Sequence, residues 1–284
     1  PELVYASLCA FGEEGPYADK PAYDHILQGM TGAAYIQSED TPEYMRQAWV
    51  DKTTALTAAQ AITAALFARE RGGSGQHLKL SMLDAGLAFL WPDGHPNTML
   101  LEEEGTQRLP GIASTYIPVE TKDGFATVAA VTGEQTEMLL IAANRPELLS
   151  DERFATPEAR LKNLVAFRKA INEAGADFTS AELTERLQAV DVPVGPILRP
   201  EEIPTFEQVV ANGSLVESEH PQLGRIREPR PAARFEDTPT AIERPSPALG
   251  EHTEEILREL GRTDTQIAKL QADGAVGAGD ERLS

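Results

Sequence analysis

The segment from Pro42 to Ala85 constrains the fold most, because it predicts a helix, a glycine-rich turn and a strand in direct succession. Apolar residues recur in it at helical spacing, at Ala55, Leu56, Ala59, Ile62 and Leu66. The basic residues before Gly72-Gly73 are typical of a helix C-terminus. Beyond the glycines, Leu78, Leu80 and Met82 alternate with polar residues, as in a half-buried strand. Phosphate-binding loops lead from a strand into a helix, so these glycines are predicted to form a plain turn.

One aspartate, Asp51, stands at the predicted start of this helix. Its carboxylate can act as a helix cap, since Asp side chains accept hydrogen bonds from the free amides of a first turn. Alternatively, a carboxylate kept charged by the helix dipole and exposed at the end of a buried element can attack an activated carbonyl. The position alone does not choose between a cap and a nucleophile.

A polar cluster, Tyr23-Asp24-His25, precedes a short helical face at residues 26–30. Taken alone, the cluster predicts a helix start with Asp24 as cap and Tyr23 half buried. The five histidines of the chain are scattered, with no pair at metal-ligand spacing. No metal site is therefore predicted.

Charge and cysteine content exclude several classes of partner. The 284 residues include 25 Lys and Arg against 45 Asp and Glu, a formal net charge of −20. Such a surface repels phosphate backbones and anionic lipids, so binding to nucleic acid or a membrane is not expected. The single cysteine, Cys9, cannot form an internal disulfide, and no signal peptide or membrane-length apolar stretch is present. A cytoplasmic location is expected. Because the first residue is Pro1 and the chain starts directly in a strand-like run at 3–8, an N-terminal part is expected to be missing.

From Leu101 onward the sequence predicts a smaller α+β region. Strands expected at 114–119 and 125–131 flank Asp123-Gly124, a strong hairpin signal. Three helical segments should follow, at 134–143, 157–174 and 180–189.

Prolines become frequent between residues 193 and 247. That stretch can be neither a continuous helix nor a central strand, and it is expected to wrap across another body. An amphipathic helix capped by Thr253 should close the chain. These changes predict a large-domain portion at 1–104, a small α+β domain at 105–210, and a proline-rich return with the C-terminal helix at 211–284.

Taken together, the ordered motifs resemble the class III CoA-transferase superfamily, which includes formyl-CoA and carnitine CoA-transferases and α-methylacyl-CoA racemases. The likeness covers nearly the whole chain in the family's order. It is carried by the loop Phe11-Gly12 to Gly15-Pro16-Tyr17, Pro21-Ala22-Tyr23-Asp24, Asp51 with its alanine-rich helix, Gly73-Ser74-Gly75-Gln76, Ser81-Met82-Leu83-Asp84-Ala85, Asp151-Glu152-Arg153-Phe154 and Leu249-Gly250-Glu251-His252-Thr253.

The resemblance implies an α/β fold with a large Rossmann-like domain, whose N-terminal part is absent here, a small α+β domain, and a chain that wraps back onto the large domain. It also implies an interlocked homodimer. Asp51 matches the aspartate that attacks an acyl-CoA thioester to give a mixed anhydride and then an aspartyl-CoA thioester, from which a small carboxylic acid completes the exchange. Tyr23 and Met82 match positions beside bound coenzyme A. Coenzyme A is thus implied as a substrate, with no permanently bound cofactor.

Two alternatives stay open. Racemases of the superfamily place a histidine just before the aspartate of the segment 21–24, whereas here that position is Tyr23 and His25 follows Asp24. A 2-methylacyl-CoA racemase is therefore the weaker interpretation. A non-catalytic acyl-CoA-binding or truncated subunit is the third. The stretch Gly105–Gly111 has few glycines where formyl-CoA transferases carry a glycine-rich loop, which argues against formyl and oxalate as substrates.

Overall fold

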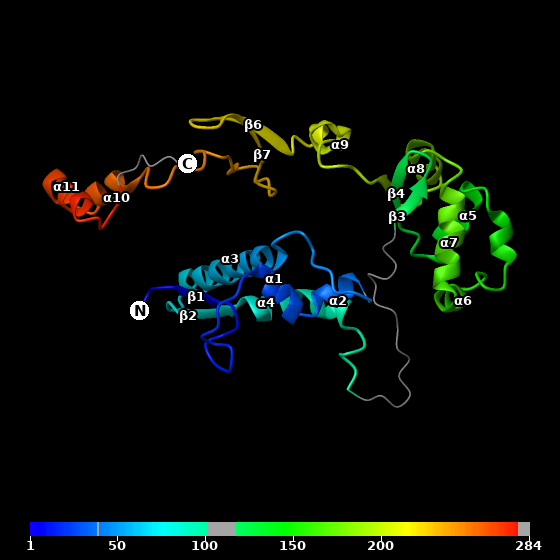
Figure 1. Ribbon diagram of the computed structural model, residues 1–284, viewed down its shortest axis with the longest axis horizontal. Coiled ribbons are helices and arrows are strands. Elements are labelled where there is room, and N and C mark those ends of the chain that lie inside the picture. Colours follow the sequence, from blue (N-terminus) through cyan, green and yellow to red (C-terminus); the bar gives the residue numbers. More distant parts are fainter. Residues whose placement is uncertain (39, 102–117, 278–284) are drawn as a thin grey trace. The chain divides into compact units, whose positions relative to one another are not determined.

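The computed structural model describes residues 1–38, 40–101 and 118–277, and it divides into two compact units, Pro1–Ile197 and Leu198–Ser284 (Figure 1). Helices and strands occur in both units, which confirms the mixed α/β class. The predicted boundaries near residues 104 and 210, the Rossmann-like assignment and the wrapping return stay predictions. The loop at 105–111 and the start of the strand expected at 114 lie outside the described residues.

Residues 1–101 are built around a parallel pair of strands. Strand β1 (Tyr5–Cys9) pairs with β2 (His77–Ser81), with Leu8 opposite Leu80. Parallel strands need a long crossover connection, which here contains α1 (Asp24–Met30), α2 (Ala33–Gln37) and α3 (Trp49–Glu70). Helix α4 (Met82–Gly94) follows β2 directly.

Helix α3 confirms the predicted helix and its glycine stop. It ends at Glu70, and Gly72 adopts a φ of +96°, a left-handed conformation that glycine takes without strain. Of the apolar residues at helical spacing, Leu56 is 73% exposed. By contrast, Val50, Thr54 and Ala65 are buried. Gly86 of α4 lies against the start of this helix, where a Cβ would be 3.5 Å from Val50 Cγ1 and 3.8 Å from the Trp49 ring.

The strand predicted through Met82 is shorter than expected. Strand β2 ends at Ser81, whose Oγ accepts a hydrogen bond from the Asp84 amide at 3.0 Å and caps α4. Met82 is consequently the first residue of that helix. Its side chain packs against a core cluster formed by Leu27, Trp49 and Val50.

Residues 118–197 contain a three-stranded antiparallel sheet in the order β3 (Pro118–Thr121), β4 (Gly124–Val128) and β5 (Val194–Pro196). Thr121 pairs with Gly124, so the predicted hairpin at Asp123-Gly124 is confirmed. Helices α5 (Gly133–Ala142), α7 (Leu164–Gly175) and α8 (Ser180–Gln188) accompany the sheet, with a 3-10 turn at Pro146–Ser150. Their shared core is formed by Val119, Ala126, Leu139, Phe178, Leu183, Leu187 and Val192.

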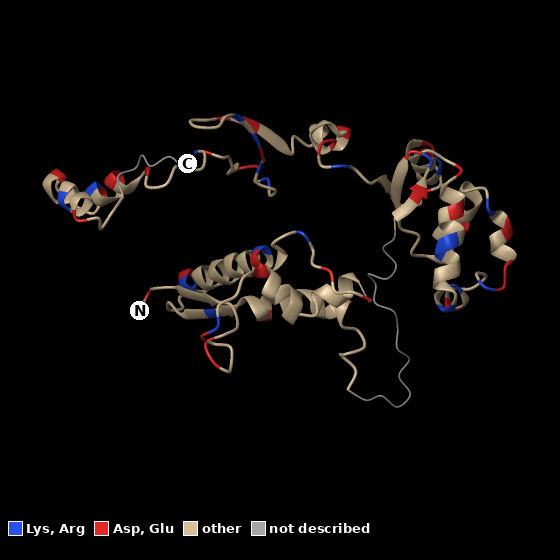
Figure 2. Cartoon of the chain, in the orientation of Figure 1, with Lys and Arg blue, Asp and Glu red and all other residues tan. Residues whose placement is uncertain are grey.

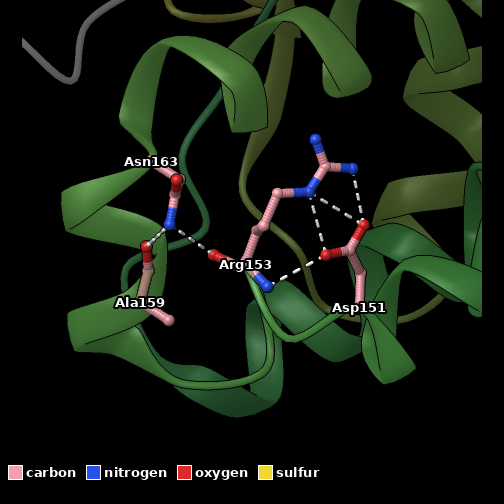
Figure 3. Close-up of polar contacts among 4 residues, drawn as sticks. All are labelled: Asp151, Arg153, Ala159 and Asn163. Atoms are coloured by element: carbon pink, nitrogen blue, oxygen red, sulfur yellow. Dashed lines mark hydrogen bonds and ion pairs between the residues drawn. The ribbon is translucent and has the colours of Figure 1, made fainter.

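The single helix expected at 157–174 is wrong, because α6 (Pro157–Lys162) ends at Lys162 and Asn163 separates it from α7. The Asn163 amide group donates to the backbone oxygens of Ala159 at 2.9 Å and Arg153 at 3.4 Å, and a side chain that bonds to the backbone competes with helix continuation (Figure 3). Nearby, the Arg153 guanidinium forms a two-pronged pair with Asp151, with Nη2 to Oδ2 at 2.7 Å. This hydrogen-bonded pair lowers the pKa of Asp151.

The unit from Leu198 carries a two-stranded antiparallel hairpin, β6 (Leu215–His220) and β7 (Gly224–Pro229). A 3-10 turn at Ile203–Thr205 and helix α9 (Glu207–Ala211) precede it, and α10 (Thr253–Glu259) and α11 (Asp264–Ala272) follow. The described stretch 193–247 is thus neither a continuous helix nor a central strand, as predicted. The cap of α10 is His252 and not Thr253, since helical geometry already includes Thr253.

Acidic and basic residues are scattered over the described elements of each unit (Figure 2). Among the described residues, none of the helices combines the length and the apolar character needed to cross a membrane.

Candidate active site

A shallow cavity of about 350 Å³ opens at the carboxyl ends of the parallel strands β1 and β2. Its walls come from the end of β1, from Ala22 two residues before α1, and from the starts of α3 and α4. The lining residues are Leu8, Cys9, Ala10, Ala22, Asp51, Thr54, Ala55 and Met82. In α/β folds, ligands bind outside the carboxyl ends of parallel strands, so the cavity lies where such a fold places its chemistry.

Asp51 supplies the charged side chain in this lining. It is the third residue of α3 and exposed, while the neighbouring Val50 is fully buried. The positive end of the helix dipole favours a carboxylate at this place. The geometry therefore presents an accessible, negatively charged oxygen pair to the cavity from a rigid helix start.

The alternative that Asp51 caps its own helix is wrong. The N-cap of α3 is Ala48, which makes no side-chain cap bond. The capping oxygen comes instead from α1, because Asp24 Oδ2 accepts hydrogen bonds from the amides of Val50 at 2.8 Å and Asp51 at 3.0 Å. The expected cap role of Asp24 at its own helix is likewise wrong, since Tyr23 occupies that N-cap position.

The other amides of this first turn are also engaged. The Trp49 amide donates to the Gln47 carbonyl at 2.9 Å, and the Lys52 amide donates to the Ala48 carbonyl at 3.2 Å. With all four amides from Trp49 to Lys52 bonded, this helix start does not provide the donors that would stabilise an oxyanion in the cavity.

Met82 and Asp51 line the same cavity. Tyr23 lies next to the lining residue Ala22, and its side chain is 77% exposed and not half buried. The roles of Tyr23 and Met82 beside coenzyme A stay predictions. Sequence reasoning missed Cys9 and Thr54 in the lining, although strand ends and helix starts are where such residues are sought.

A second cavity of about 270 Å³ shares Cys9 with the first and is lined by polar groups such as Ser7, Glu13 and Lys79. Lys79 forms an ion pair with Glu13 and holds the pKa of that carboxyl below its usual range. Ser7 Oγ also donates to Glu13 Oε1 at 3.1 Å. Ser7, Glu13 and Lys79 therefore satisfy one another's hydrogen bonds and charges.

His25, the residue on which the racemase alternative depends, is exposed and makes an edge-on ring contact with Tyr44 at 6.3 Å between centroids. None of the eight residues that line the Asp51 cavity in the described chain is a histidine. Within the described residues, no group of three or more histidine, cysteine, aspartate or glutamate side chains is arranged to hold a metal ion.

A carboxylate at a helix start, beside the carboxyl ends of parallel strands, is the kind of site at which α/β enzymes bind their ligands. The sequence profile of CoA-transferase family III matches residues 1–253, and the chain is a member of this family. The resemblance inferred from the sequence motifs is thereby confirmed.

Two relatives carry names for the same kind of reaction. A protein of Agrobacterium fabrum named succinate–glutarate CoA-transferase is 35% identical over 266 residues, covering 92% of this chain and 66% of the relative. Mouse succinyl-CoA:glutarate CoA-transferase is 29% identical over 281 residues, covering 97% of this chain and 64% of the relative. The chain thus spans 64–66% of the length of these two relatives.

The fold has a solved counterpart. The crystal structure of a CAIB/BAIF family protein from Brucella suis aligns with a TM-score of 0.74 at 29% identity, covering 92% of this chain and 68% of that one.

Proposed function

We propose that the protein is an acyl-CoA:carboxylate CoA-transferase in which Asp51 is the nucleophile. The observation that carries this proposal is the meeting of Asp51 and Met82 on one cavity at the carboxyl ends of β1 and β2. Family membership and the names of the relatives support the reaction type. The substrates are an acyl-CoA and a small carboxylic acid, and coenzyme A is bound as part of a substrate and not as a resident cofactor.

The first half of the reaction transfers coenzyme A to the enzyme. A carboxylate oxygen of Asp51 attacks the thioester carbonyl, the carbon–sulfur bond breaks, and coenzyme A leaves as its thiolate, which gives a mixed anhydride. The thiolate then attacks the Asp51 carbonyl of the anhydride. This step releases the donor as a free carboxylate and leaves an aspartyl-CoA thioester.

The second half repeats the steps in reverse with the acceptor. The acceptor carboxylate attacks the aspartyl thioester, coenzyme A leaves again, and a second anhydride forms. Attack of the thiolate on the acceptor carbonyl gives the new acyl-CoA and restores the Asp51 carboxylate. No water is consumed, so the thioester energy is conserved, and the cavity must exclude water from both anhydrides.

Tyr23 and Met82 are proposed to lie beside coenzyme A. Met82 supplies a flexible apolar wall. The exposed Tyr23 side chain donates from its hydroxyl toward the developing oxyanion, a role that the four engaged amides at the start of α3 do not take.

Replacement of Asp51 by Asn tests this proposal in the complete protein that the gene encodes. Succinyl-CoA and glutarate are the first substrate pair, chosen from the names of the relatives. Asp51→Asn is expected to lower the rate of CoA transfer by orders of magnitude, since an uncharged amide cannot form the anhydride. The free energy of unfolding should fall by less than about 1 kcal/mol, the contribution of one charge at a helix N-terminus.

Glu134→Gln is the matched control, because it removes the same charge from the exposed first turn of α5. It should leave transfer unchanged. Mass spectrometry of the unsubstituted protein with succinyl-CoA should find an adduct on the peptide that contains Asp51. Unchanged transfer in folded Asp51→Asn would overturn the nucleophile assignment, and binding of acyl-CoA without transfer in the unsubstituted protein would favour the non-catalytic alternative.

We also propose an interlocked homodimer, in which the proline-rich stretch 193–247 wraps across a second copy. The irregular backbone after β7 suits such a wrapping segment. Sedimentation of the complete protein should give the mass of a dimer, and a monomer at micromolar concentration would contradict this.

A further inference from the structure

Asp24 and Gln28 form a buried polar pair on α1, and neither residue is among those that line the Asp51 cavity. Asp24 is 8% exposed and Gln28 is 2% exposed. The two oxygens of Asp24 have different partners: Oδ1 accepts from Gln28 Nε2 at 2.5 Å, and Oδ2 accepts from the Val50 and Asp51 amides. A buried carboxylate costs free energy unless it is fully hydrogen-bonded, and here the hydrogen bonds are directed at the start of α3.

Gln28 extends this pair to the chain that leads into α3. Its Nε2 donates to the carbonyl oxygens of Met45 at 3.2 Å and Gln47 at 2.9 Å as well as to Asp24. Its Oε1 is buried without a hydrogen-bond partner among the described atoms. A 180° flip of the Gln28 side-chain amide would place Oε1 against three acceptor oxygens, so the network fixes the orientation of this amide.

The Asp51 carboxylate has no comparable support. Its backbone amide is held by Asp24, but among the described residues no hydrogen bond to the Asp51 side-chain oxygens is present. Its place in the cavity is therefore determined by the backbone of the first turn of α3 and by the side-chain rotamer. Whatever holds that backbone determines where the nucleophilic oxygens lie.

We propose that Asp24, oriented by Gln28, is a positioning residue that holds the first turn of α3 so that Asp51 reaches the thioester carbonyl. This inference rests on the proposed role of Asp51 as nucleophile. Asp24 is not one of the cavity-lining residues and acts through the backbone amides of Val50 and Asp51. Reaction rates are sensitive to such placement, since a misplacement of about 1 Å can lower a rate by about 100-fold.

Single-turnover acylation of the complete protein by succinyl-CoA tests the inference, with the Asp51 adduct followed by mass spectrometry. Asp24→Ala removes both acceptor oxygens and is expected to lower the rate constant about 100-fold. Asp24→Asn keeps one acceptor oxygen for the two amides, so its rate constant should lie between that of Asp24→Ala and that of the unsubstituted protein. Gln28→Met keeps the bulk of the side chain, removes the donor to Asp24 Oδ1, and should also lower the rate constant.

The rate constant and the amplitude separate positioning from a loss of folded protein. A merely structural role would reduce the amount of adduct formed and leave its rate constant unchanged. A positioning role reduces the rate constant at full amplitude. Thr179→Ala is the matched control, since it removes a capping side chain from α8, where Thr179 accepts from the Glu182 amide at 3.2 Å. Its rate constant should equal that of the unsubstituted protein.

The exchange rates of the Val50 and Asp51 amide hydrogens supply a readout that does not depend on activity, and they should rise in Asp24→Ala. An unchanged rate constant in folded Asp24→Ala would overturn this inference and leave the proposed function intact. If Asp24→Ala does not fold, an unchanged rate constant in Asp24→Asn together with Gln28→Met would overturn it equally. Absence of an adduct in the unsubstituted protein would overturn the proposed function first, and this inference with it.

Discussion

A methyl group added at Gly175 is expected to separate α7 from β3. Gly175 is the last residue of α7, and a Cβ there would lie 2.4 Å from Val119 Cγ1 and 2.6 Å from the Glu120 carbonyl oxygen. Ordinary van der Waals contact begins near 3.4 Å, so the helix and the strand must move apart by close to 1 Å. The obstacle at Glu120 is backbone, which cannot rotate away. Such a movement also strains the hydrogen bond from the Glu120 amide to Asn172 Oδ1, now 3.2 Å long.

The same substitution at Gly133 provides the reference, because a Cβ at this first residue of α5 meets no atom within 4 Å. Gly133→Ala should stabilise the protein by about 0.4–1 kcal/mol through the unfolded chain. Gly175→Ala should destabilise it by about 1–3 kcal/mol through overpacking. The two variants are therefore expected to differ by roughly 1.4–4 kcal/mol.

Hydrogen–deuterium exchange with peptide-level mass spectrometry measures this difference within residues 118–197. Peptides from β3 and α7 should exchange at least about tenfold faster in Gly175→Ala than in Gly133→Ala, since 1.4 kcal/mol corresponds to a factor of ten. Equal exchange in the two variants would refute the close approach of α7 and β3.

Three further predictions concern single residues. Tyr23→Phe removes only an exposed hydroxyl, so turnover should fall while the thermal midpoint is unchanged; a parallel loss of both would indicate a structural role for the ring. Leu27→Ala empties a fully buried site beside Trp49 and should cost about 2–5 kcal/mol in urea unfolding followed by tryptophan fluorescence, and a cost well below that range would contradict the packing. The Ser180 amide donates to the Asp123 carboxylate and lowers its pKa from the ordinary value of 3.8. This hydrogen bond therefore stabilises the folded protein at neutral pH, and the stabilisation is lost as the pH falls below 3.8 through the lower pKa of the folded state. Asp123→Asn should flatten that acid dependence in a pH titration of stability, and an unaltered acid limb would count against it.

Local patterns predicted the elements that local chemistry determines. The stop of α3 at Gly72 and the hairpin at Asp123-Gly124 both follow from backbone preferences of the residues themselves, and both are present. The break at Asn163 escaped prediction, because it depends on an amide group that reaches back to Arg153, ten residues earlier. The exposure of Leu56 also escaped prediction, because helical spacing alone does not show which face of α3 its neighbours cover.

The candidate site could be predicted only in part for the same physical reason. Asp51 was identifiable as a charged residue at a helix start next to an ordered set of family motifs. The residue that caps this helix could not be identified from the sequence, because Asp24 lies 26 residues before Val50. Capping patterns in a sequence are recognised only among residues within one turn of the helix start. The lining of the cavity by Cys9 and Thr54 likewise arises from the pairing of β1 with β2 and the packing of α3 beside them.

The parallel pairing of β1 and β2 has a consequence for the order in which the chain folds. Ser7 and His77, whose side chains meet at 2.9 Å across the two strands, are 70 residues apart in the chain. Closing so long a loop is entropically unfavourable until the helices between the strands have already shortened it. The two strands that frame the Asp51 cavity therefore come together late, so that the cavity is completed near the end of folding.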